Sequence, residues 1–280
     1  SDEPDSTKMS FTVPQGLFCV SNGQLQSRQP RGMNKETFVW KVSNPINHYN
    51  ISFYIGNYRT FQIPYEKDSV THQLTYYVLP QNLETAKSHF KQTNDMLHFY
   101  EEKFGDYQWF DDGYKLIESP FAGMEHQSAI AYGDKYKNNY NGFDYIILHE
   151  TAHEWWGNSV SVGDFADIWL HEGFATYSEA LYVEEISGYK AYLNYLYVYS
   201  LSIKNGKPMV GPRDVKYWTY KDGDPYVKGA LTLHSLRSSI NNDKLFFDIL
   251  KTFHLENSRK IVSSDDFIAL VNLKTRENYD

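Results

Sequence analysis

The chain has 280 residues, of which 41% are hydrophobic and 17% aromatic, a length sufficient for one large core with a smaller appended domain. Its formal net charge is -8 and it has no run of four basic residues, so its charge pattern does not favour a nucleic-acid-binding surface. The single cysteine, Cys19, excludes an internal disulfide scaffold, and no apolar run reaches the roughly 20 residues that a membrane span requires.

The N-terminal part of the chain has the pattern of β-strands. Two short strands are predicted around Asn22-Gly23, a dipeptide that tolerates the positive φ angles of a tight hairpin turn. Further strands are predicted in the alternating or aromatic segments 37–45, 50–58 and 73–80. These segments indicate a β-domain that carries no chemistry of its own.

After Pro80 the hydrophobic period becomes helical. In segment 82–105 apolar residues recur at helical spacing, and Gly105 is the expected C-terminal stop. Further helices are predicted at 144–157, 168–187, 227–240, 244–255 and 264–275, and Gly188 is expected to end the second of these. The pattern predicts an α+β protein in which a β-unit precedes a mostly helical domain with a small mixed sheet.

The predicted helix 144–157 contains a candidate metal site. His149 and His153 are four residues apart, and positions i and i+4 lie on one helix face with Cβ atoms about 5–6 Å apart. Both imidazoles can therefore bind one ion, and Glu150 can reach a water on that ion without being a ligand. The alternative is a helix that contains two of the ten histidines by chance, and the motif alone leaves both interpretations open.

A catalytic zinc needs a third protein ligand and an open fourth position. The candidate is Glu172, which follows His153 with 18 residues between them and lies in an apolar segment near the start of the predicted helix 168–187. A buried carboxylate in such a segment is costly unless it is paired or bound to metal. His171 and His126 are the competing candidates, and His171 points elsewhere on the same helix.

With these residues in place, the sequence resembles the gluzincin zinc aminopeptidases, the family of the aminopeptidase N and leukotriene hydrolase type. The resemblance rests on four motifs in order: D-E-P at 2–4, A-G-M-E-H at 122–126, H-E-x-x-H with Glu172, and Y-V-K-G-A at 226–230. It implies that residues 1–75 are the C-terminal part of an N-terminal β-domain. Residues 76–280 would form a thermolysin-like zinc catalytic domain of the zincin type with a small mixed sheet.

The resemblance implies a zinc-dependent aminopeptidase, a hydrolase that removes the N-terminal residue from peptides and binds one Zn²⁺ per chain. His149, His153 and Glu172 would match the zinc ligands. Glu150 would match the general base that acts on zinc-activated water. Tyr226 would match the tyrosine that hydrogen-bonds the tetrahedral oxyanion.

The segment 122–126 would match the family's substrate-binding motif. Glu125 would hold the free α-ammonium group of the substrate, and the backbone of Ala122 and Gly123 would line the peptide channel, with Met124 in the same motif. Ala122 replaces a glycine of the family pattern. His126 stands where the family usually has asparagine; its ring can still donate a hydrogen bond, and its charge can change with pH.

Two other functions remain open. One is a zinc endopeptidase of the same H-E-x-x-H chemistry, and the other is an inactive fragment that acts only in binding. The expected partners are peptides with a free N-terminus, without nucleic acid or a membrane span, and flanking domains of a full-length protein are expected to be missing. The chain is expected to be soluble. Its sequence does not distinguish a cytoplasmic from an exported protein, since the native N-terminus is expected to be absent.

Overall fold

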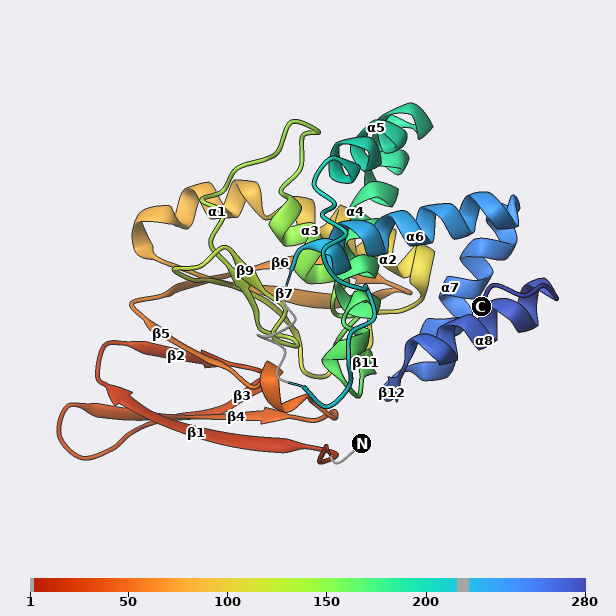
Figure 1. Cartoon of the computed structure of the whole chain (residues 1–280). Coiled ribbons are helices and arrows are strands. Elements are labelled where there is room, and N and C mark those ends of the chain that lie inside the picture. Colours follow the sequence, from red (N-terminus) through yellow and green to blue (C-terminus); the bar gives the residue numbers. More distant parts are fainter. Residues whose placement is uncertain (1–2, 216–221) are drawn as a thin grey trace. The chain divides into compact units, whose positions relative to one another are not determined.

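The computed structural model describes residues 3–215 and 222–280 (Figure 1), so Asp2 of the D-E-P motif lies outside the described residues. The chain divides into two compact units. Unit 1 comprises Ser1–Leu97 and Tyr107–Glu154, and unit 2 comprises His98–Asp106 and Trp155–Asp280. The predicted domain boundary after residue 75 falls within strand β7 (Val70–Val78) and stays a prediction.

Unit 1 begins with two small antiparallel sheets. Strands β1 (Thr7–Pro14), β4 (Lys35–Val42) and β3 (Gln24–Pro30) form the first, in that order. Strands β2 (Phe18–Ser21) and β5 (Phe53–Gly56) form the second. Both sheets contribute side chains to one buried apolar cluster, which includes Val13, Cys19, Val20, Phe38, Trp40 and Tyr54.

A five-stranded mixed sheet completes the strand part of unit 1. Its order is β6-β7-β8-β10-β9, formed by β6 (Arg59–Lys67), β7, β8 (Tyr114–Glu118), β10 (Ile130–Tyr132) and β9 (Gly123–Met124). Strands β7, β8 and β10 are parallel, and the two outer strands pair antiparallel. Gly123 and Met124 of the A-G-M-E-H segment therefore form the edge strand β9. The short 3₁₀ helices η1 (His48–Asn50) and η2 (Pro80–Asn82) lie in the connections.

The hairpin predicted at Asn22-Gly23 is wrong, although both flanking strands exist. β2 pairs with β5 and β3 pairs with β4, so the dipeptide links two sheets. Gly23 has φ 76°, and a Cβ there would meet the backbone of Lys41. The Asn22 side chain donates to the carbonyl oxygens of Asn50 at 3.0 Å and Gln127 at 2.7 Å, so long-range hydrogen bonds fix this turn.

The predicted helix 82–105 is divided into α1 (Leu83–His89) and α2 (Gln92–Phe104), and α2 contains the boundary between the two units. Gly105 follows α2 with φ 102°, as expected for a C-terminal stop. Helix α3 (Tyr145–Ala152) is shorter than the predicted segment 144–157. The backbone amide of Glu154 already bonds to the Thr151 carbonyl, a tighter turn that ends the helix.

Unit 2 is mostly helical, as predicted. It contains α4 (Trp169–Ser187), α5 (Tyr189–Ser200), α6 (Asp224–Ile240), α7 (Asp243–Asn257) and α8 (Ser264–Thr275). A short parallel pair, β11 (Val160–Val162) and β12 (Lys260–Val262), and the 3₁₀ helix η3 (Phe165–Asp167) complete it. Helix α4 is buried continuously from Trp169 to Val183 and is the central helix of this unit. None of the helices in the described residues combines the length and the apolar character needed to cross a membrane.

Helices α4 and α6 cross at a pair of glycines. A Cβ on Gly173 would lie 2.9 Å from the Gly229 Cα, and a Cβ on Gly229 would lie 2.8 Å from the Gly173 Cα. The two backbones therefore touch, and larger residues cannot be accommodated without movement of a helix. This close approach allows the Tyr226 hydroxyl on α6 to donate a hydrogen bond of 2.8 Å to Glu172 Oε1 on α4.

We expect Gly173→Ala to destabilise the protein by about 1–3 kcal/mol, since the added methyl group forces two packed helices apart. Urea unfolding measures this difference as a lower midpoint at unchanged slope. Gly206→Ala is the matched control, because among the described residues, its chain neighbours aside, no atom lies within 4 Å of a Cβ built there. Equal stability of Gly173→Ala and Gly206→Ala would contradict the tight crossing.

Candidate active site

Helix α3, which carries the H-E-x-x-H motif, begins at a buried cap. Asp144 precedes it, and one carboxylate oxygen accepts hydrogen bonds from the amides of Ile146 at 3.0 Å and Ile147 at 3.4 Å. The other oxygen accepts from the Tyr132 hydroxyl at 2.6 Å and lies 2.7 Å from His89 Nε2. The start of the helix is therefore fixed to the five-stranded sheet, which limits movement of the residues that follow.

The two histidines lie on one face of this helical segment. Their Nε2 atoms are 3.2 Å apart, although His153 lies just past the end of α3 as its C-terminal cap. Two nitrogen ligands bound tetrahedrally at 2.0–2.1 Å from one zinc lie about 3.3 Å apart. The observed separation therefore fits a shared Zn²⁺.

Two carboxylates lie beside this histidine pair within unit 1. Glu125, Glu150 and His153 each offer a ligand-type atom, and these three atoms lie within 4.8 Å of one another. All three side chains are at most 8% exposed. The predicted base Glu150 and the predicted amine anchor Glu125 are thus brought together, as the sequence hypothesis requires.

Gly123 packs directly against Glu150. A Cβ on Gly123 would contact the Glu150 carboxylate oxygen and lie 2.8 Å from its Cγ and Cδ. Glycine is therefore needed here because of its close approach to the Glu150 side chain, and not because of an unusual φ angle. Ala122 is exposed and its carbonyl accepts from the Gly133 amide at 2.8 Å, while Met124 packs against the apolar cluster of unit 1.

We expect Gly123→Ala to lower turnover about 100-fold, because the added methyl group displaces Glu150, the predicted general base, and a shift of about 1 Å has effects of that size. The measurement is kcat on an aminoacyl amide, together with zinc content and thermal stability. Gly206→Ala again serves as the control, since it adds the same methyl group in open space. Unchanged kcat in Gly123→Ala would show that Glu150 is free to move or is not needed.

His126 is held by a residue far away in the sequence. Its Nδ1 lies 2.5 Å from the hydroxyl of Tyr54 on β5, and the two rings pack edge to face. Burial lowers the pKa of His126 to about 4, so this imidazole is neutral near pH 7. The expectation that its charge changes with pH is therefore not met near neutrality.

Glu172 and Tyr226 belong to unit 2. Glu172 is 8% exposed in the first turn of α4, and Tyr226 lies in the first turn of α6. The competing ligand His171 is 1% exposed, and its Nε2 accepts a hydrogen bond of 3.1 Å from the Val162 amide. That nitrogen lone pair is engaged in holding β11, which weakens the case for His171 as a metal ligand.

Sequence reasoning missed three buried residues around the motif. Asp144 was detectable, because aspartate directly before a helical segment is a typical N-cap. Glu154, 1% exposed, accepts the Ser128 amide at 2.8 Å and thereby ties the end of the motif to the loop after Glu125. Tyr54 carries no local signal, since it is one of 24 tyrosines and lies in an ordinary aromatic strand.

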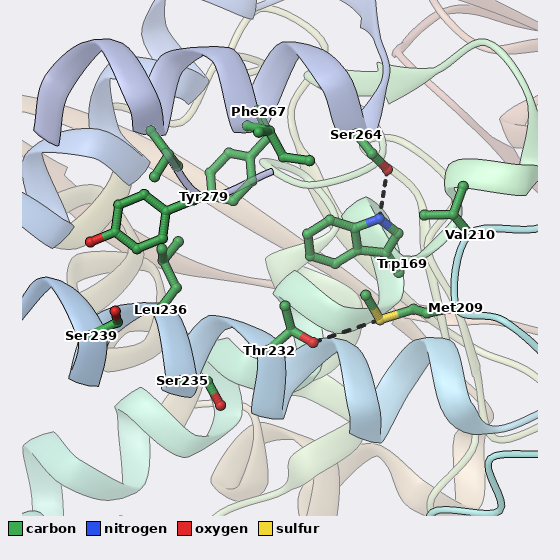
Figure 2. A pocket seen from close by; sticks show the side chains of 12 residues that line it. Trp169, Met209, Val210, Thr232, Ser235, Leu236, Ser239, Ser264, Phe267 and Tyr279 are labelled. Atoms are coloured by element: carbon green, nitrogen blue, oxygen red, sulfur yellow. Dashed lines mark hydrogen bonds between the residues drawn. The ribbon is translucent and has the colours of Figure 1, made fainter. Parts of the chain in front are cut away.

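A cavity of about 380 Å³ lies within unit 2, at α6 and α8 (Figure 2). Trp169, Leu236 and Phe267 line it, and the Trp169 indole donates to Ser264 Oγ at 2.7 Å. Its other lining residues are apolar, hydroxyl-bearing or sulfur-bearing, so the described lining offers no carboxylate or imidazole. This cavity lacks the groups for metal-assisted hydrolysis and is not the candidate active site.

A sequence model described as "Peptidase family M1 domain" matches residues 88–279. Aminopeptidase N of Streptomyces lividans is 31% identical over 196 residues, which is 64% of this chain and 22% of that protein. Aminopeptidase B of Rattus norvegicus is 26% identical over 288 residues, which is 91% of this chain and 40% of that protein. The chain thus spans less than half the length of these relatives.

The structure is similar to a crystal structure of an M1 zinc metallopeptidase from Deinococcus radiodurans. The TM-score is 0.79 at 22% identity, and the match covers 96% of this chain and 60% of that one. A mutant of that enzyme bound to the substrate Tyr-Ser-Ala also has a TM-score of 0.79, at 23% identity. At this level of identity the likeness shows the fold, and the predicted α+β fold class is confirmed.

Proposed function

This chain belongs to peptidase family M1, as its motifs predict, and from that premise we propose that it is a zinc-dependent aminopeptidase. The observation that carries it is the pair of imidazoles in unit 1 with Nε2 atoms 3.2 Å apart, beside the buried carboxylates Glu125 and Glu150. Residues 1–75 are proposed as part of a β-domain, and residues 76–280 as a thermolysin-like zinc catalytic domain.

The proposed zinc ligands are His149, His153 and Glu172. Two neutral imidazoles and one carboxylate are a ligand set typical of catalytic zinc, and they leave one position for water or substrate. When bound, zinc supplies Lewis-acid chemistry, which polarises a carbonyl group and makes a water molecule more acidic. The hydrogen bond from Tyr226 to Glu172 Oε1 would then orient the third ligand.

Glu150 is proposed as the general base and acid. Its carboxylate takes a proton from the attacking water and later delivers it to the nitrogen of the leaving amine. Tyr226 is proposed to donate its hydroxyl proton to the oxygen that becomes negative in the transition state. Because that hydroxyl donates to Glu172 in this structure, it must turn or share its proton when substrate binds.

Substrate recognition is assigned to the segment 122–126. Glu125 is proposed to bind the α-ammonium group of a peptide, which internal residues do not possess. The backbone of Ala122 and Gly123, with Met124 and His126, would line the place of the first peptide unit. The proposed substrates are therefore peptides with a free N-terminus. An endopeptidase is the second candidate in chemical terms, but the buried carboxylate Glu125 beside Glu150 favours recognition of an ammonium group.

The test is hydrolysis of a panel of fluorogenic aminoacyl amides and of the same compounds with an acetylated amine. We expect the protein to cleave the free amines at least about 100-fold faster, to lose activity with 1,10-phenanthroline, and to regain it with added zinc. Cleavage of both series at similar rates would favour the endopeptidase. Activity that persists without metal would exclude zinc hydrolysis.

Glu125→Gln is expected to remove most of the preference for free amines, because the neutral amide lacks the negative charge that strengthens a hydrogen bond to an ammonium ion. A lost hydrogen bond to a charged group costs roughly 1.5–3 kcal/mol, so kcat/KM should fall by about 10–100-fold on free amines only. An equal loss of kcat/KM on acetylated substrates would show that Glu125 has a role other than binding the α-ammonium group.

A further inference from the structure

We propose that His126 is a specificity-determining residue, whose imidazole Tyr54 holds in the tautomer that accepts a hydrogen bond at Nε2 from the ammonium group of the substrate. This inference rests on the proposed aminopeptidase function and adds a second acceptor beside Glu125.

The tautomer follows from the hydrogen bonds of Tyr54. Its hydroxyl lies 2.8 Å from the carbonyl oxygen of Ala129 and 2.5 Å from His126 Nδ1. A carbonyl oxygen can only accept, so the single phenolic proton is donated to Ala129. His126 Nδ1 must then carry a proton and donate it to the Tyr54 oxygen.

A neutral imidazole carries one N–H, so a proton on Nδ1 leaves Nε2 with a lone pair. Burial keeps His126 neutral at pH 7, because it lowers the pKa of this ring to about 4. Nε2 is therefore an acceptor and cannot donate. An asparagine at this position can present either its carbonyl oxygen or its amide, whereas the Tyr54 contact fixes the histidine as an acceptor.

Tyr54 is well placed to impose this state. It is 7% exposed in the apolar cluster of unit 1, and β5 holds its backbone in register with β2. The pKa of its hydroxyl is raised, chiefly by burial and further by nearby charges that include Glu150 and Glu125. The hydroxyl thus stays protonated and lies within electrostatic range of both site carboxylates.

The second nitrogen of His126 is available to a ligand. The ring is only partly buried, and the structure of residues 3–215 and 222–280 records a hydrogen bond at Nδ1 and none at Nε2. Nε2 lies across the ring from the nitrogen that contacts the buried hydroxyl. A primary ammonium group has three N–H donors, so it can bond to a carboxylate and to an imidazole acceptor at the same time.

The tautomer can be tested without turnover. In zinc-loaded protein labelled with ¹⁵N-histidine, a long-range ¹H–¹⁵N spectrum distinguishes protonated from unprotonated ring nitrogens, and His126→Asn identifies the His126 signals. We expect a protonated Nδ1 and an unprotonated Nε2 whose signal shifts with L-alaninol but not with N-acetyl-L-alaninol. A protonated Nε2, or equal shifts with both ligands, would overturn the proposal.

Kinetics give the second readout. Tyr54→Phe and His126→Phe should raise KM for aminoacyl amides at least about tenfold with little change in kcat, since each weakens a hydrogen bond to a charged group. The control is Tyr58→Phe, which removes a hydroxyl that donates to the Glu118 carbonyl at 2.9 Å. Equal KM values for Tyr54→Phe and Tyr58→Phe would overturn the proposal.

The two proposals fail separately. If the wild-type chain hydrolyses nothing but its His126 spectrum shows an acceptor Nε2 and a selective response to L-alaninol, the amine site stands and the proposed enzymatic function falls. If the chain is active and Nε2 is protonated, the function stands and the role of His126 falls.

Discussion

Replacement of Glu150 by Gln is expected to lower turnover by at least about 1,000-fold while zinc remains bound. The amide has the shape of the carboxylate but cannot take a proton, and general-base catalysis contributes about 10²–10⁴-fold. Glu150 is 7% exposed and packs against Gly123, so the change in chemistry occurs with little change in shape. The measurements are kcat on an aminoacyl amide and zinc content by elemental analysis.

Glu154→Gln is the matched control, because it makes the same change at a neighbouring buried carboxylate. Glu154 Oε1 accepts the Ser128 amide, and a glutamine oxygen can do the same. We expect its activity to stay within about tenfold of the wild type. Hydrolysis that survives in Glu150→Gln would remove this residue from the proton transfers, and equal losses in both variants would point to general disruption of the motif.

Glu172→Gln is expected to weaken zinc binding more than about 100-fold, with complete loss of activity at limiting zinc. A neutral amide is a poorer ligand than a carboxylate, and even residues that only support a ligand typically change metal affinity by 10–100-fold. Competition with a chromophoric chelator measures the affinity. The isosteric glutamine still has an oxygen that can accept the Tyr226 hydrogen bond, so the packing of α4 against α6 is preserved.

Tyr226→Phe separates ligand binding from transition-state stabilisation. It removes the hydroxyl that donates to Glu172 but leaves all three proposed ligands. We expect nearly full zinc occupancy and turnover reduced about 10²–10³-fold, the usual effect of losing one oxyanion donor.

For the Glu172→Gln variant, a zinc affinity equal to that of the wild type would show that the third ligand is another residue.

Local patterns explain why much of the fold was predictable. Helix α4 and its end at Gly188 follow from apolar spacing and a terminal glycine, and the strands follow from alternation and aromatic content. The hairpin at Asn22-Gly23 was wrong because its partners are distant. Asn22 bonds to Asn50 and Gln127, and no short-range rule contains those contacts.

In the candidate site, too, contacts between residues close in sequence were predictable, and contacts between distant residues were not. The spacing of His149 and His153 is a property of one helical turn, so the sequence was sufficient to predict that the two imidazoles meet. The contact between Tyr54 and His126 joins residues 72 positions apart, and only the folded structure reveals it. The packing of Gly123 against Glu150 is equally invisible in the sequence, where the glycine suggests only closeness to a substrate.

The contact between Gly173 and Gly229 makes the spacing of α4 and α6 adjustable in one direction only. Both residues already lack a side chain, so no natural substitution at either position brings the axes nearer. Every mutation at either position can only increase the distance between the two helix axes, and with it the distance from the Tyr226 hydroxyl to the Glu172 carboxylate. Directed evolution of this chain therefore has to refine that distance elsewhere, for example where Asp224 accepts the amides of Lys204 and Asn205 at the head of α6.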